Sequence, residues 1–213
     1  NDSILVTTRD ERDGYYSSVF KVNVNTGEFK KYLPNKNQII GWYPDRFGEI
    51  LMAVGVDKDP NTDIYYYYTR ESSNDEWKLI KKTEDYKSST FTPIQYDKET
   101  DSVIVKSDRE LNKDALWRYF IKTSKFELLG EAPGNLDISN ALYRRTGNVI
   151  DVVGFTYNDN FVERVYFDAS KNKLEMNLVK FFKSKGLHAF FTSRDLKQKR
   201  YIISTLSDKK PTK

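Results

Sequence analysis

The sequence contains no cysteine and only one histidine, His188, among its 213 residues. Without thiols the chain forms no disulfide, has no thiolate nucleophile and offers no cysteine ligand to a metal. A Ser-His-Asp triad would have to use His188, and any metal site would depend on carboxylates. The nucleophile elbow G-x-S-x-G is also absent. We therefore predict no catalytic residue, no cofactor and no metal ligand in this chain.

Long apolar stretches are missing as well. No run of about 18 apolar residues occurs, so we predict no membrane insertion. Residues 1–3 lead directly into a strand-like segment instead of a signal peptide, and an abrupt start of this kind suggests a segment of a longer protein. The absence of cysteine is compatible with both the periplasm and the cytoplasm, so the localisation stays unknown.

The charge excess is small, with a formal net charge of +4 and a sequence pI near 8.9. Lysine and arginine are spread through the predicted turns, and one small cluster occupies residues 197–200. A nucleic-acid reader concentrates its basic residues on one face with aromatic residues between them. Because this cluster lies in a hairpin between two predicted strands, we interpret it as a solvated turn and predict no nucleic-acid partner.

Aromatic residues are abundant, at 15% of the chain with 15 Tyr and 13 Phe. They mark short strand-like segments, seen most clearly between residues 91 and 130. That stretch contains four apolar or aromatic runs separated by turn residues, at 91–96, 102–106, 115–121 and 126–129. This pattern predicts an antiparallel meander. A single sheet of this size cannot bury both of its faces, so it must stack against others.

The same unit recurs along the chain. The apolar second strand of each repeat starts near residues 4, 50, 103, 149 and 201, so successive starts are 46, 53, 46 and 52 residues apart. A period of roughly 40–50 residues with four strands per repeat is typical of β-propeller blades. The alternative is an irregular β-sandwich. We predict an all-β fold, a β-propeller portion built of four-stranded antiparallel blades that form an incomplete ring.

The repeats fall at about 3–35, 38–82, 90–131, 137–182 and 187–213, in a single propeller segment over residues 1–213. The first lacks its innermost strand, and the last has two strands only. The run 173–182 is ambiguous, and the alternation of Leu174, Met176 and Leu178 favours a strand there. Because natural proteins avoid open sheet edges, we expect the remaining blades to belong to a longer parent protein.

Several polar residues invite a functional interpretation. His188 begins a predicted inner strand and is best interpreted as a structural or rim residue. Asp57, Asp108 and Asp208 follow second strands at equivalent repeat positions, so capping of the following loops is expected, with contacts to a channel as the alternative. The segment 57–59 resembles a calcium loop but lacks its glycine and its distal glutamate.

Aromatic and cationic residues raise the same question. In a strand Tyr65 and Tyr67 share one face, and Tyr66 and Tyr68 share the other, so the run 65–68 is expected to pack between blades; a ligand platform is the alternative. Further candidates for contacts at the rim are Trp42, Arg144 and Arg145.

Five segments carry a family resemblance. Residues 39–51 resemble the W-S-P-D-G-K-x-L strand–turn–strand of TolB-like and peptidase propellers. The order of the remaining four, residues 149–154, 165–168, 190–195 and 204–211, is similar to the last blades of the N-terminal propeller in prolyl oligopeptidase family serine peptidases. The acylaminoacyl-peptidase and dipeptidyl-aminopeptidase-like branch shows the greatest similarity.

This resemblance implies a non-catalytic propeller region that packs on an α/β-hydrolase domain of the parent protein and gates the access of peptide substrates. The chain by itself would be inactive, and the parent's catalytic domain would lie outside it. The alternative is a TolB-like propeller that acts as a protein–protein binding or scaffold module. A propeller enzyme that is active by itself is a third class, and we expect no hydrolysis by this chain alone.

Overall fold

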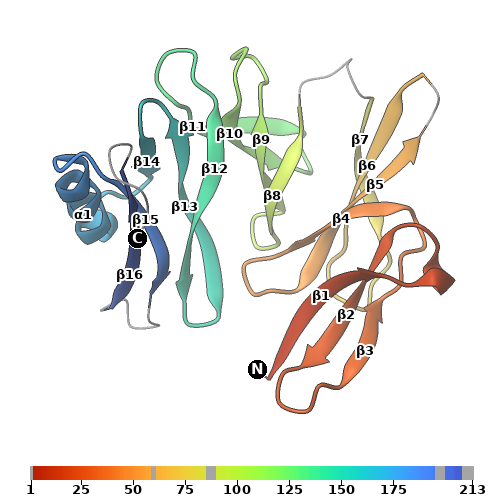
Figure 1. Ribbon diagram of the computed structural model, residues 1–213. Coiled ribbons are helices and arrows are strands. Elements are labelled where there is room, and N and C mark those ends of the chain that lie inside the picture. Colours follow the sequence, from red (N-terminus) through yellow and green to blue (C-terminus); the bar gives the residue numbers. More distant parts are fainter. Residues whose placement is uncertain (1, 59–60, 85–89, 195–199, 208–213) are drawn as a thin grey trace. The chain divides into compact units, whose positions relative to one another are not determined.

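The computed structural model describes residues 2–58, 61–84, 90–194 and 200–207 (Figure 1). The chain is all-β, and its strands form consecutive antiparallel meanders in which sequence neighbours pair with one another. Two compact units result. Unit 1 comprises Asn1–Asp45 with Glu49–Ser89, and unit 2 comprises Arg46–Gly48 with Thr90–Lys213.

The described residues of unit 1 form two sheets. The first has three strands in the order β1-β2-β3, and the second has four in the order β4-β5-β6-β7. A short 3-10 helix, η1 (Glu11–Asp13), separates β1 from β2. The strands are β1 (Ser3–Arg9), β2 (Ser17–Asn23), β3 (Phe29–Leu33), β4 (Ile39–Pro44), β5 (Ile50–Lys58), β6 (Asp63–Thr69) and β7 (Lys78–Glu84).

The described residues of unit 2 form three sheets of four, three and two strands. The third sheet of the chain comprises β8 (Thr92–Asp97), β9 (Ser102–Ser107), β10 (Ala115–Phe120) and β11 (Lys125–Gly130). The fourth comprises β12 (Ile138–Thr146), β13 (Val149–Asn158) and β14 (Val162–Tyr166). After η2 (Ser170–Asn172) and α1 (Lys173–Lys183), a hairpin of β15 (His188–Arg194) and β16 (Tyr201–Leu206) follows.

A tight turn joins β4 to β5. Between β4 and β5, the Asp45 backbone N–H donates to the Glu49 carbonyl at 2.7 Å, and the Asp45 carboxylate accepts from the Glu49 N–H at 2.9 Å. Gly48 takes a φ of +88°, a left-handed conformation that glycine adopts without steric cost. The aspartate and the glycine thus reverse the chain in a few residues, and strand pairing resumes at once.

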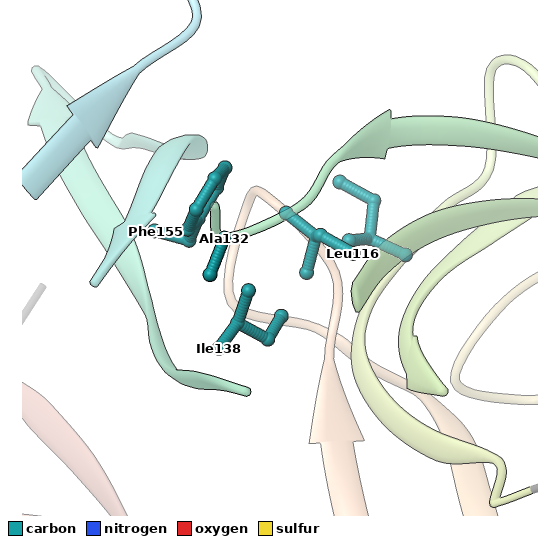
Figure 2. Close-up of a cluster of buried hydrophobic side chains, with 5 residues drawn as sticks. Leu116, Ala132, Ile138 and Phe155 are labelled. Carbon is teal, nitrogen blue, oxygen red and sulfur yellow. The ribbon is translucent and has the colours of Figure 1, made fainter. Parts of the chain in front are cut away.

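Stacking of neighbouring sheets builds the core. In unit 1, Val19 and Leu33 of the first sheet pack with Ile50 of the second. In unit 2, Leu116 of the third sheet lies beside Ile138 and Phe155 of the fourth (Figure 2). The first sheet therefore packs on the second and the third on the fourth, which is how consecutive propeller blades bury their apolar side chains.

The first two sheets are also joined by a buried polar residue, Asn35. Its side-chain amide donates to the carbonyls of Ser17, at 3.0 Å, and Ile39, at 2.7 Å, and its Oδ1 accepts from the Ile39 N–H at 2.8 Å. The Asn35 backbone N–H donates to the Ser18 hydroxyl at 2.9 Å. Because the side-chain groups of Asn35 find partners, its burial carries little desolvation penalty.

The predicted strand at Leu174–Leu178 is wrong, because these residues belong to the helix α1. The exposed positions, Leu174 among them, share one side of the helix. The less exposed positions lie on the other side, at Asn172, Glu175, Met176, Leu178, Val179 and Phe182. Lysine, leucine, glutamate and methionine are strong helix formers. The apolar run satisfies both periods, and the helical one prevails because it buries one continuous side of the helix.

The all-β, propeller-blade class predicted from the repeats is confirmed, with antiparallel four-stranded sheets at β4–β7 and β8–β11. The strands predicted near residues 4, 50, 103, 149 and 201 are β1, β5, β9, β13 and β16. Among the described residues, no helix has the length and apolarity needed to cross a membrane.

Candidate functional site

The first sheet presents apolar side chains to solvent. Cross-strand pairing places Ile4, Val22 and Phe29 in one row across its three strands. Phe20 lies in the next row beside Val6, and its ring stacks on Phe29 with centroids 4.5 Å apart. Ile4 is 53% exposed and Phe29 is 52% exposed, whereas Phe20 is 6% exposed. We call these five residues the first-sheet patch, a surface of the kind that marks interaction sites.

The edge of β1 adjoins this patch. In the part of the chain that the structure describes, β1 pairs with β2 alone. The equivalent strands of the second and third sheets, β5 and β9, each pair with a further strand on that side, β4 and β8 respectively. The backbone groups along the outer edge of β1 are therefore able to pair with another strand.

A cavity of about 330 Å³ lies within unit 2. Its lining comes from the fourth sheet, from the segment around α1 and from the hairpin β15–β16, elements that neighbour one another in Figure 1. The helix is held against β14 by an ion pair between Lys183 and Glu163. The lining residues are Ala141, Leu142, Tyr143, Arg144, Val153, Arg164, Tyr166, Asn172, Glu175, Phe191 and Tyr201.

A buried hydrogen bond lies in the cavity wall. The Tyr166 hydroxyl donates to Glu175 Oε2 at 2.6 Å, and the Glu175 side chain is only 7% exposed. Burial of the phenol raises the pKa of Tyr166 far above its usual value, and the neighbouring Glu175 carboxylate raises it further. The nearby Arg164 acts in the opposite direction, without cancelling the increase in pKa. Tyr166 therefore remains a neutral donor at physiological pH.

Two further polar groups in this wall have no hydrogen-bond partner within the described residues. They are Nε of Arg144 and Oδ1 of Asn172. Asn172 is 3% exposed, and its amide nitrogen donates to the Asp168 carbonyl at 2.6 Å. Arg164 lies over the ring of Phe191, 5.1 Å from its centroid. The cavity thus combines two guanidinium groups, one carboxylate, one amide and aromatic rings.

The turn before α1 positions Asn172. The Asp168 carboxylate accepts hydrogen bonds from the Ser170 N–H and hydroxyl, at 3.0 and 2.6 Å, and from the Lys171 N–H at 3.3 Å. The hydrogen bonds from Ser170 and then Lys171 lower the pKa of Asp168 to about 2. The ionised carboxylate therefore holds the chain in the conformation that directs Asn172 into the wall.

Of the predicted residues, His188 begins β15, as expected. Its ring lies against that of Phe161, with centroids 4.4 Å apart, which agrees with a structural role. It does not line the cavity described above. No group of three or more His, Asp or Glu side chains able to hold a metal occurs within the described residues.

The three aspartates predicted to cap loops differ from one another. Asp108 follows β9, and its carboxylate accepts from the N–H of Thr90 at 2.7 Å and from its hydroxyl at 3.1 Å, so it ties the start of β8 to the end of β9. For Asp57 the prediction is wrong, because it lies inside β5, paired with Ile64. The strand continues further than the charged residue suggested. Asp208 and Asp59 lie outside the described residues.

The tyrosine run occupies β6 with the predicted alternation. Tyr66 and Tyr68 stack with centroids 6.4 Å apart, and Tyr67, on the opposite face, is buried. The packing interpretation is confirmed for Tyr67. Burial is the main cause that raises the pKa of Tyr67 above its usual value.

The three residues predicted to make rim contacts lie in different environments. Trp42 packs beside the core of unit 1, and its indole N–H donates to the Ser17 carbonyl at 3.0 Å. Arg145 is exposed and donates to the Gly147 carbonyl at 3.0 Å. Of the three, only Arg144 lines the unit 2 cavity. Sequence reasoning missed Arg164, Asn172 and Glu175, and the helical spacing from Asn172 to Glu175 was the one available signal.

Among the comparisons with known proteins, the search of solved structures gives a distant likeness. The chain is similar to the crystal structure of TolB from Acinetobacter baumannii, with 14% sequence identity and a TM-score of 0.44; the alignment covers 97% of this chain and 49% of that one. The chain therefore spans about half the length of that structure. No protein-family model matches the chain, and no curated protein matches it. Membership of the prolyl oligopeptidase family remains a prediction.

Proposed function

We propose that this chain is a protein-interaction module of the propeller-blade class, which binds an extended segment of a partner protein along the open edge of β1. The observation that carries this proposal is the coincidence of that edge with the first-sheet patch. An added strand gains backbone hydrogen bonds from the edge, and its alternate side chains extend the apolar rows of the sheet.

The strand that pairs at the equivalent position in the second sheet indicates what sequence a partner segment would have. In the second sheet, β4 occupies the position beside β5 that is open beside β1, and β4 has the uncharged, largely apolar sequence Ile-Ile-Gly-Trp-Tyr-Pro. A partner strand beside β1 would likewise direct one apolar side chain in two toward Ile4 and Val6. The proposed ligand is therefore an extended, uncharged segment with apolar residues at every second position.

A peptide-binding measurement tests this proposal. A fluorescently labelled peptide with the sequence of residues 37–45 is titrated with the intact chain, and its anisotropy is recorded. We expect saturable binding. Ile4→Gln removes an apolar contact of the patch and should weaken binding about tenfold, the equivalent of about 1.4 kcal/mol.

The matched control is Leu5→Gln. Leu5 is the adjacent residue of β1 and points to the opposite face, where its cross-strand neighbour is Lys21. Its replacement should leave peptide affinity within about twofold, since no patch contact changes. Absence of saturable binding, or an equal loss for both variants, would contradict binding along this edge.

The expectation of an α/β-hydrolase partner and of gated peptide substrates remains a prediction from the family resemblance. It is tested on a protein that carries the sequence downstream of residue 213. Labelling of that protein by a serine-directed fluorophosphonate, with none for this chain alone, would support it. A downstream sequence without a G-x-S-x-G elbow would count against it.

A further inference from the structure

The cavity beside the fourth sheet shares no residue with β1 and has a chemistry of its own. Its charged side chains come from three different elements: Arg144 from β12, Arg164 from β14, and Glu175 from α1. Its volume of about 330 Å³ falls near the lower end of the range for small-molecule pockets, roughly 300–1,000 Å³. A site of this size fits a small organic group.

The cavity has an excess of positive charge. Arg144 and Arg164 contribute two guanidinium groups, whereas Glu175 is the only carboxylate among the described residues of the lining. Oε2 of Glu175 accepts a hydrogen bond from the Tyr166 hydroxyl. Within the described residues, no ion pair joins Arg144 or Arg164 to a carboxylate. The described lining groups therefore carry a net charge of +1, which a monoanion would neutralise.

The hydrogen-bonding capacity of the wall is incomplete. Within the described residues, Nε of Arg144 is a buried donor without a partner and Oδ1 of Asn172 is a buried acceptor without one. Buried polar groups in folded proteins are nearly always hydrogen-bonded, so such groups call for an explanation. A ligand that presents an anionic oxygen to the arginine and an N–H to the asparagine would supply both missing partners.

These observations define the ligand class. The planar guanidinium group pairs with carboxylates and phosphates in bidentate fashion. A dianionic phosphate would leave excess negative charge beside Glu175, whereas a carboxylate balances the site. Phe191 and Tyr201 add aromatic walls suited to an apolar side chain. We infer that this cavity binds a carboxylate adjacent to an N–H group, the chemistry of an N-acylated amino acid and of the C-terminal residue of a peptide.

A titration of the intact chain tests the ligand class. N-acetylphenylalanine, N-acetylphenylalaninamide and inorganic phosphate are each titrated and followed by two-dimensional NMR of the backbone amides. We expect saturable shifts around β12, β14 and α1 with the acid, at least tenfold weaker binding of the amide, and no saturation with phosphate. Equal binding of the acid and the amide, displacement of the acid by phosphate, or no binding of any probe would overturn the inference.

A matched pair of arginine variants locates the site. Arg144→Gln removes a charge from the cavity and should weaken binding of N-acetylphenylalanine at least tenfold. Arg145→Gln removes the same charge from the next residue of β12, which is exposed and outside the cavity, and should leave the affinity unchanged. An equal loss in the two variants would show a general electrostatic effect and would overturn the assignment.

A filling variant keeps the test decisive if Arg144→Gln fails to fold. Ala141→Leu adds volume to the cavity wall while retaining every polar group, so thermal unfolding should remain cooperative while binding of the acid is lost. Unchanged binding by a folded Ala141→Leu chain would overturn the inference.

The tripeptide Ala-Ala-Phe distinguishes the two sources of the ligand. Tighter binding of the tripeptide than of N-acetylphenylalanine identifies a protein C-terminus, and the reverse order identifies a small acylated amino acid. Both orders support the inferred chemistry. Neither order of affinities depends on peptide binding at the edge of β1. The experiments can therefore contradict the cavity inference and the proposed protein-binding function independently.

Discussion

Two buried asparagines show how differently the two units use a polar side chain between neighbouring elements. Asn35 joins the first and second sheets, and its side chain forms three hydrogen bonds, to Ser17 and Ile39. Asn172 lies between the fourth sheet and α1, and its side chain donates one hydrogen bond while its Oδ1 has no partner within the described residues. Both residues are less than 5% exposed.

The difference teaches that burial alone does not define a structural residue. At Asn35 the surrounding backbone supplies the partners, so the amide acts as a rigid connection between two sheets. At Asn172 the surroundings leave space and unused bonding capacity, which has an energetic cost unless something else occupies the site. The first arrangement favours stability, and the second is typical of a site that receives a ligand.

The largest expected effect comes from replacing each asparagine by leucine. Asn35→Leu should lower the free energy of unfolding by about 3 kcal/mol, because it leaves the Ile39 N–H and two carbonyls unpaired in a buried position. Asn172→Leu should cost less than about 1 kcal/mol, because it also removes an acceptor that had no partner. Urea unfolding of both variants measures the two losses in the free energy of unfolding. Equal losses would contradict the contrast.

A second comparison concerns packing. Gly130 lies against Phe155, and a β-carbon on Gly130 would come within 2.5 Å of the Phe155 ring. Gly130→Ala should therefore destabilise the chain by about 2 kcal/mol through overpacking. Ala141→Leu, in the cavity, should instead be neutral or stabilising by up to about 1 kcal/mol, since it adds apolar contact where space exists.

Thermal and urea unfolding check both packing variants. Combining Gly130→Ala with Phe155→Leu should recover part of the loss, because the smaller side chain makes room for the added methyl group. No recovery in the double variant would indicate that the backbone, not the ring contact, causes the destabilisation.

The smallest expected effect depends on pH. The pKa of Asp168 is lowered to about 2, whereas an aspartate in an unfolded chain titrates near 3.9. A carboxyl with a depressed pKa stabilises the fold above its unfolded value, and this contribution is lost as the pH falls through the folded value. The stability difference between the wild type and Asp168→Ala should therefore be constant above about pH 5 and should shrink toward pH 2.

Denaturant unfolding at several pH values measures this difference, with Asp159→Ala as an exposed control for general charge effects. Asp168→Ala weakens the turn that positions Asn172, so this variant should also bind the inferred carboxylate ligand less tightly at pH 7. A difference that grew as the pH fell would contradict the assigned role of Asp168.

Much of the fold was predictable because strand pairing in this chain is local. Each meander joins strands that are neighbours in sequence, and turn residues such as Asp45 and Gly48 mark where the chain reverses. The helix α1 was not predictable from the alternation of Leu174, Met176 and Leu178, because its short apolar run fits two periods and the choice depends on burial against β14 and β15. The cavity was less predictable still, since its residues come from separate elements.

The sequence by itself determined the succession of small antiparallel sheets, since period-two apolar runs and turn residues act over short distances along the chain. Only the tertiary structure decided which buried polar groups found partners. Hydrogen bonding depends on what neighbouring elements present at a distance of about 3 Å, and no local pattern encodes that. For this reason Asn35 became a structural connection, whereas Asn172, Arg144 and Arg164 came together around a cavity.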